Sequence, residues 1–148
     1  MKLAKFSILL ALTAFSFAGA ANAGTYALIV NSANPASGDA MKAEVKNLFL
    51  KQKTSWPSGD EAEPTARAAG SPEHAALLKS VLGMNQAALD GHWASEKSKS
   101  GTSAPKEVSS DSILFRQIGK KKGAFGYVPQ SAVTPPPEGV KVLFTFSD

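Results

Sequence analysis

The sequence contains no cysteine, and this absence excludes several kinds of stabilisation and chemistry. No disulfide can form, no thiolate can bind a metal ion, and no cysteine is available to carry a lipid. The protein must therefore be held together by its hydrophobic core.

Histidine is nearly as scarce, with His74 and His92 as the only two. No cluster of acidic residues or further histidines at ligand spacing accompanies either, so we expect no metal site and no other cofactor. Ser109, Ser110 and Asp111 could suggest nucleophilic chemistry, but no histidine is placed to activate a serine. We interpret them as the start of a helix and expect a protein that is not an enzyme.

The first 23 residues have the three parts of a secretory signal peptide. Lys2 and Lys5 form a positive n-region, Phe6 to Ala18 is an apolar h-region, and "ANA" at 21–23 supplies a small-x-small cleavage site. A membrane anchor is the alternative, but the apolar run is short for a span and no stop-transfer pattern follows. We expect cleavage after Ala23, no stable membrane anchor afterwards, and one mature domain at 24–148. The bacterial periplasm is the expected location, with the outside medium as the other option.

The mature domain has little excess charge of either sign. Removing Lys2 and Lys5 from the 16 basic residues leaves 14, against 12 acidic residues, a net charge of about +2. This excess is too small for a nucleic-acid footprint, so we expect no nucleic-acid partner. We interpret the lysines of "GKKKG" (119–123) as the solvated C-terminal end of a helix.

Short runs rich in apolar and aromatic residues, each beside turn residues, predict strands at Thr25–Asn31, Gly123–Val128 and Val140–Phe146. We expect a fourth, short strand at Glu63–Arg67, leading into the helix that follows. Between them, "SKSGTSAPKE" (98–107) is small and polar, and we expect a flexible loop there.

Apolar residues at helical spacing predict four helices, and capping residues mark their ends. One starts near Asp39, one spans Pro72–Leu82 and stops at Gly83, one is capped by Asn85, and one by Ser109 or Ser110. Their inward residues are Met41, Val45, Leu48 and Phe49 in the first, Leu89 and Trp93 in the third, and Ile113, Leu114 and Ile118 in the last. The alternation of strands and helices predicts a small three-layer α/β domain with a mixed sheet.

Four landmarks occur in an order that resembles the substrate-binding proteins of bacterial phosphate ABC transporters. They are "VNSANP", "LFLKQKTSWPSG", an Arg-x-x-Gly-Ser turn into a helix ending "LGM", and "KKGAFGYV". The resemblance runs from Tyr26 to the last strand and is closer still to a group of short, single-lobe relatives. It implies one lobe of a type 2 periplasmic-binding fold, whose full-length members close two lobes over a ligand. Any cleft in this chain would then be open or completed by a partner.

The family turn reads Arg-x-Asp-Gly-Ser-Gly-Thr, and Arg67, Gly70 and Ser71 match it. The resemblance implies that the arginine pairs with phosphate oxygens while backbone N–H groups of the helix N-terminus donate to the anion. Unpaired donors and a positive dipole end make such a helix start suitable for an oxyanion.

Three departures from that turn favour a helix that caps itself. Ala69 replaces the aspartate, Pro72 removes one N–H donor, and Glu73 brings a negative charge into the first turn. Proline at the first helical position suits an extended Ser71, whose hydroxyl would accept from the N–H of Glu73 or His74. An oxyanion cradle and a capped helix both remain open at this point.

Two further features have a functional and a structural interpretation. Asn31, Ser32 and Asn34 follow the first strand, at the end where open α/β sheets usually bind ligands, or they form only a turn. Trp56, in a loop before Pro57, could line a cleft but more often such a tryptophan closes the edge of a core.

These observations support two hypotheses. In the first, the protein binds phosphate or a related small oxyanion near Arg67, Gly70, Ser71 and the Asn31 to Asn34 loop, in a phosphate-transporter context. In the second, the ligand site is lost and the lobe is an interaction module that docks onto an envelope or sensor protein.

Overall fold

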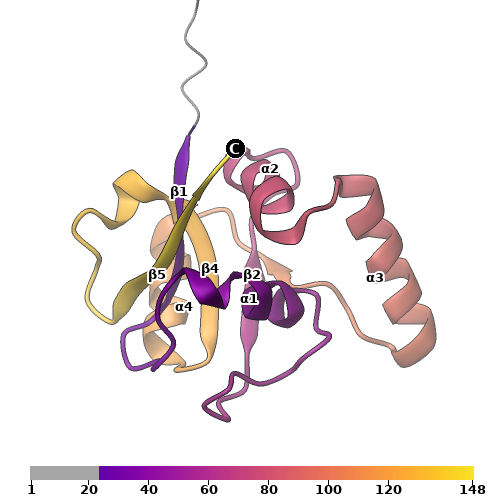
Figure 1. The fold of residues 1–148 in the computed structure, drawn as a ribbon, viewed down its shortest axis with the longest axis horizontal. Helices are drawn as coiled ribbons and strands as arrows, with labels where there is room; N and C mark the ends of the chain where they lie inside the picture. Colours follow the sequence, from indigo (N-terminus) through magenta and orange to yellow (C-terminus); the bar gives the residue numbers. More distant parts are fainter. Residues whose placement is uncertain (1–23) are drawn as a thin grey trace, which may run out of the picture.

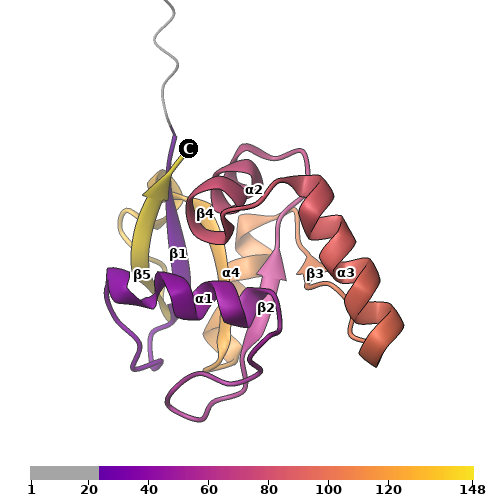
Figure 2. The same cartoon turned by 45° about the vertical axis from the view of Figure 1, so that its right-hand side comes forward.

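The apolar run at 25–31 forms β1 (Thr25–Asn31), an inner strand of a five-stranded sheet. The computed structural model describes residues 24–148, so the expected signal peptide lies outside the described residues. Figures 1 and 2 show the sheet standing between helices on its two sides. Over the described range, no helix is long and apolar enough to cross a membrane.

The sheet is mixed, as expected, with the strand order β3-β2-β4-β1-β5. β1 pairs in antiparallel fashion with β4 (Ala124–Pro129) on one side and β5 (Val140–Ser147) on the other. β2 (Glu63–Ala66) is parallel to β4 and to the short β3 (Lys106–Glu107). Consequently β1 and β2 run in opposite directions (Figure 2).

Alternating side chains of β1 divide the core between the two faces of the sheet. Leu28 and Val30 pack toward α1 (Lys42–Phe49), α2 (Pro72–Leu77) and α3 (Gln86–Ser100). Ala27 and Ile29 pack toward α4 (Asp111–Lys120) on the opposite face. The expected three-layer α/β domain is therefore confirmed. Short helical turns η1 (Asp39–Met41), η2 (Leu78–Leu82) and η3 (Gln130–Val133) complete the chain.

Four sequence-based boundaries or faces differ from the structure. The strand expected at 63–67 ends at Ala66, and the helix expected at 72–82 changes to a π-helical turn at Leu78. The loop expected at 98–107 is shorter, because α3 continues to Ser100 and two residues pair with β2. Ile113 is 46% exposed, because Leu114 and Ile118 make the buried stripe of α4.

The "GAFGYV" segment is glycine-rich because two other parts of the protein approach its backbone closely. A Cβ on Gly123 would overlap the carbonyl oxygen of Glu61, and one on Gly126 would lie 2.7 Å from a methyl carbon of Leu114. Gly123 also accepts hydrogen bonds at its carbonyl oxygen from the indole of Trp56, at 2.9 Å, and from the N–H of Glu63. This residue therefore joins the Trp56 loop to the centre of the sheet.

Trp56 belongs to the core, as the structural interpretation of its loop predicted. Its side chain is 2% exposed, and its ring packs edge-on against Phe125 with centroids 5.3 Å apart. The loop carrying it is therefore fixed by burial and by the indole hydrogen bond.

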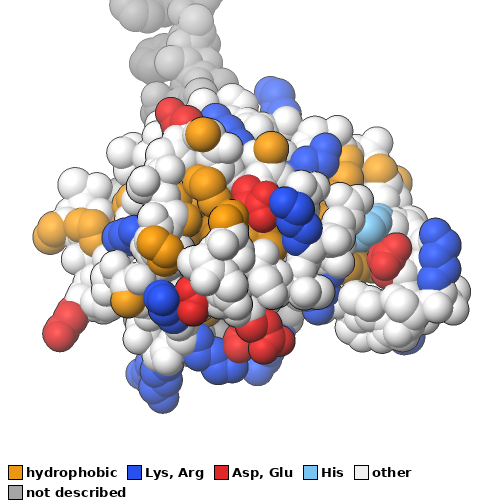
Figure 3. All heavy atoms as spheres, turned by 60° about the horizontal axis from the view of Figure 1, so that its bottom comes forward, with side chains coloured by type: hydrophobic (Ala, Val, Ile, Leu, Met, Phe, Trp, Pro, Cys, Tyr) orange, Lys and Arg blue, Asp and Glu red, His pale blue; other side chains and the backbone are white. Residues whose placement is uncertain are grey.

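Charged side chains of both signs are intermingled on the face shown in Figure 3. The exposed Lys121 pairs with Glu63, and Lys122 pairs with Asp60. The end of α4 thus places its lysines beside carboxylates.

Candidate functional site

The turn before α2 is a capped helix start. Ser71 has the extended backbone of an N-cap residue (φ −78°, ψ 147°), and Pro72 occupies the first helical position. The N–H of His74 donates to the Ser71 hydroxyl oxygen at 3.4 Å, and that hydroxyl donates to the carbonyl of Ala68 at 2.7 Å. The capping predicted from the sequence is confirmed. Such a cap contributes about 1 kcal/mol to helix stability.

Arg67 lies at the end of β2 and is only 6% exposed. Its Nε donates to a carboxylate oxygen of Glu73 at 3.2 Å, and its Nη2 donates to Asp111 at 2.7 Å. Nη2 also donates to the carbonyl of Ser109 at 3.2 Å. The protein itself thus supplies the acceptors that the oxygens of a bound anion would supply. Within residues 24–148, the buried Nη1 is left without an acceptor.

The two carboxylates make this turn a poor place for a free oxyanion. An anion on the Arg67 guanidinium would lie close to both Glu73 and Asp111, which already bind it. Two unit charges about 4 Å apart repel by about 4 kcal/mol at an effective dielectric near 20. The attraction of one arginine is therefore offset by two repulsive neighbours.

A chain of hydrogen bonds runs beneath Arg67 into α3. The backbone N–H of Arg67 donates to the Tyr127 hydroxyl at 2.8 Å, and that oxygen lies 2.7 Å from Nδ1 of His74. Nε2 of His74 lies 3.0 Å from the side-chain amide oxygen of Gln86. The amide nitrogen of Gln86 in turn donates to a carboxylate oxygen of Asp90 at 2.7 Å. Since an amide oxygen only accepts, we assign the proton to Nε2, and Tyr127 then donates to Nδ1.

Sequence reasoning did not single out four partners in the network around Arg67: Gln86, Asp90, Asp111 and Tyr127. Tyr127 is part of the "GAFGYV" landmark. A tyrosine hydroxyl in an otherwise apolar strand was a signal that this residue has hydrogen-bond partners in the core. Asp111 was assigned only to a helix start, and nothing local marks it as a partner of Arg67, 44 residues earlier.

Burial raises the pKa of Tyr127, because the phenolate would lose its hydration; the charges of Glu73 and Glu107 act in the same direction. The N–H and the charge of Arg67 oppose this rise with smaller effects. The hydroxyl therefore stays protonated in the folded protein at pH values where an unfolded tyrosine, of pKa about 10, ionises.

Tyr127→Phe should lower the free energy of unfolding at pH 7 by about 1–3 kcal/mol, because it leaves the Arg67 N–H and Nδ1 of His74 without a partner. The folded pKa of Tyr127 is raised, so its contribution is fully present below about pH 10 and is lost as the pH rises further. Urea denaturation at pH 8 and at pH 10.5 measures both effects. The wild type should lose more stability between these pH values than the variant, and an equal loss would contradict the assignment.

The Asn31 to Asn34 loop has a structural role. The side-chain amide of Asn31 donates to the carbonyl of Ile118 at 2.7 Å, and that of Asn34 donates to the backbone carbonyl of Lys122 at 3.3 Å. Their side-chain oxygens accept from backbone N–H groups two residues further on. Ser32 is exposed, and its N–H donates to the carbonyl of Gly139. The loop thus fastens the end of β1 to the end of α4.

The two groups of predicted site residues are not brought together. Arg67 contacts the start of α4, whereas Asn31 contacts its end. Seven residues of α4, from Asp111 to Ile118, separate these points, a helical rise of about 10 Å. Gly70 and Ser71 lie beside Arg67, with Gly70 exposed, so only this half of the expected set forms one cluster. Ligand binding by either group stays a prediction.

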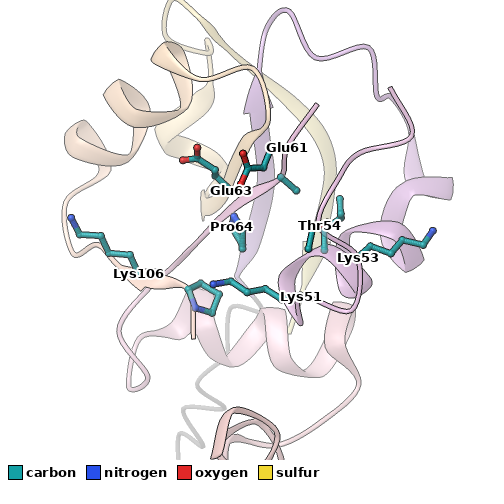
Figure 4. Close-up of a pocket in the computed structure, with 10 residues that line it drawn as sticks. Lys51, Lys53, Thr54, Glu61, Glu63, Pro64 and Lys106 are labelled. Carbon is teal, nitrogen blue, oxygen red and sulfur yellow. The ribbon is translucent and has the colours of Figure 1, made fainter. Parts of the chain in front are cut away.

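A separate hollow of about 370 Å³ lies beside β2 (Figure 4). Lys51 extends across it, Glu61 and Glu63 lie on its other side, and Lys53 points away. Lys51 donates to the carbonyl of Ser103, and Glu63 pairs with Lys121. Most of these charged groups therefore already have hydrogen-bond or ion-pair partners within the protein. In the described part of the chain, no group of three or more histidine, aspartate or glutamate residues could hold a metal ion.

The fold is similar to that of solved phosphate-transport proteins. The chain superposes on an ABC-type phosphate transport receptor from Vibrio cholerae with a TM-score of 0.51 and 19% identity, and on PstS from Borrelia burgdorferi with 0.58 and 10%. A third structure, from Clostridium perfringens and with bound phosphate, has a TM-score of 0.57 and 15% identity. No protein-family model matches the sequence. A search of curated proteins found no similar sequence.

The overlap with these proteins is partial. The superpositions cover 81%, 82% and 81% of this chain but only 46%, 47% and 45% of the three structures. The chain therefore spans less than half the length of each. This agrees with the single-lobe resemblance and shows a fold shared with part of the larger proteins.

Proposed function

We propose that this protein is an exported, non-enzymatic, single-lobe binding module that docks onto a partner protein and does not take up free phosphate. The observation that carries the proposal is the occupation of Arg67 by Glu73 and Asp111. Replacing the anion by internal carboxylates keeps the turn rigid and removes the need for a ligand. The similarity in fold supports descent from a binding protein, and the signal-peptide pattern of residues 1–23 supports action in the periplasm.

Thermal unfolding of residues 24–148 with millimolar sodium phosphate or sulfate, and with sodium chloride at matched ionic strength, tests this proposal. A ligand present at 100 times its Kd would stabilise the fold by about 2.7 kcal/mol. We expect equal Tm values in all three salts. A Tm that rises saturably with phosphate alone would contradict the proposal.

Oxyanion binding at Arg67, Gly70 and Ser71 is the second candidate, and one observation favours it. Nη1 of Arg67 is buried and has no acceptor among the described residues, so it has a free donor to offer. For an anion to bind there, the carboxylate of Glu73 would have to give up its hydrogen bond to Nε of Arg67. Under this candidate Glu73→Gln should strengthen phosphate binding. An Asn31→Ala variant is the matched control, because Asn31 lies at the other end of α4.

A further inference from the structure

A small pocket lies directly beside Arg67, between the end of β2, the α3 helix and the segment that leads into β3. Its volume is about 230 Å³, below the 300 Å³ typical of the smallest drug-sized ligand sites. It therefore suits one side chain rather than a whole cofactor. The charged and aromatic groups that line it are Phe49, Arg67, His74, Asp90, Trp93 and Glu107.

The charge around this pocket is negative, although Arg67 lines it. Asp90 and Glu107 lie on its walls, and both are exposed. Glu73 and Asp111 bind the Arg67 guanidinium from its other sides. One positive and four negative side chains give a formal net charge of −3, so the positive charge of Arg67 is already compensated. A cation would be attracted here, and a phosphate would be repelled.

The remaining walls suit the carbon chain of a long basic residue. Phe49, Leu89 and Pro105 are buried apolar residues of the pocket, and Trp93 is half-buried there. Lysine and arginine bury their methylene groups along such surfaces and keep the charged end near carboxylates or over an indole ring.

Arg67 has one donor without a partner among the described residues, beside this pocket. Arg67 lines the pocket, its side chain is 6% exposed, and its Nη1 has no acceptor within residues 24–148. A buried donor without a partner is costly. A main-chain carbonyl arriving with a basic side chain would provide that acceptor, and a carbonyl adds no negative charge to an already acidic site.

We propose that this pocket receives an arginine or lysine side chain of a partner protein, with Asp90 and Glu107 binding its charge and Trp93 covering its stem. The proposal rests on the interaction function proposed above and names the chemistry of the partner. It places the docking surface on α3 and the β3 segment, at the same end of the sheet as the Arg67 turn (Figure 2).

Titration of residues 24–148 with the peptide acetyl-Ala-Arg-Ala-amide at low salt tests the proposal. The protein has two tryptophans, and Trp56 is buried in the core away from this pocket, so a fluorescence change on titration reports on Trp93. We expect saturable binding that weakens at least about tenfold in D90N/E107Q and weakens with added salt. D39N/E138Q, which changes two exposed acids outside the pocket, should bind as the wild type does.

Four results would overturn the proposal. The first three are no arginine-peptide binding, equal binding of acetyl-Ala-Gln-Ala-amide, and equal binding by D90N/E107Q with an unchanged melting curve. Tighter binding of free arginine amide than of the peptide would also overturn it, because the occupant would then be a small molecule. A phosphate titration in the same series separates the two proposals. If phosphate has no effect and the peptide does not bind, only the pocket proposal fails.

Discussion

Replacing Arg67 by methionine should lower the free energy of unfolding by about 3 kcal/mol. Removing one partner of a buried ion pair typically costs about 3–5 kcal/mol, because the remaining charge stays buried and unpaired. Here Glu73 keeps 14% of its side chain exposed, but Asp111 keeps 39% and can be hydrated. The expected cost is therefore near the lower end of that range. Urea denaturation at pH 7 measures it.

Arg116→Met is the matched control for this prediction. Arg116 is exposed on α4 and makes no ion pair within the described range. Its replacement should change the free energy of unfolding by no more than about 0.5 kcal/mol. If Arg67→Met were as mild as Arg116→Met, Arg67 would not be held by internal carboxylates.

Gly123→Ala should have an even larger effect, a loss of about 4 kcal/mol or more, or failure to fold. Its new Cβ would overlap the carbonyl oxygen of Glu61 and lie 2.7 Å from the carbonyl carbon, and a backbone group cannot rotate away as a side chain can. Separation of the two segments would also weaken the hydrogen bond from the Trp56 indole. Changes of this size are exceptional for single substitutions and follow from such steric causes. Circular dichroism and urea denaturation measure the loss.

The control is Gly91→Ala, the same substitution in the middle of α3. Apart from its chain neighbours and the adjoining backbone of α3 itself, no atom lies within 4 Å of a Cβ built at Gly91. Because alanine is the better helix former, this variant should gain about 0.5–1 kcal/mol. A Gly123→Ala protein with wild-type stability would contradict the close approach of Glu61.

The main elements of the fold were predictable because local patterns determine them. β1 and the Ser71 and Asn85 caps could be read directly from branched residues, from Pro72 and from capping side chains. Ile113 could not be placed, because it borders the apolar stripe of α4 and only the packing of the sheet decides which side is covered.

The candidate site was harder to predict because it depends on long-range pairing. The direction of β1 relative to β2 follows from the whole sheet, and it places Asn31 and Arg67 at opposite ends of α4. The pairing of Arg67 with Asp111 has no local signal either. Glu73, in contrast, was recognisable from its place in the first turn, although its partner proved to be Arg67 as well as the helix dipole.

A double-mutant cycle between Arg67 and Glu73 tests most directly whether the protein supplies the anion for its own arginine. The free energies of unfolding of Arg67→Met, Glu73→Gln and the double variant would be compared with that of the wild type. Residues in direct contact couple by about 0.5–3 kcal/mol, and for this buried pair we predict at least about 1 kcal/mol of favourable coupling. Additive effects within about 0.5 kcal/mol would show that Glu73 is not a counter-ion of Arg67 and would contradict this account.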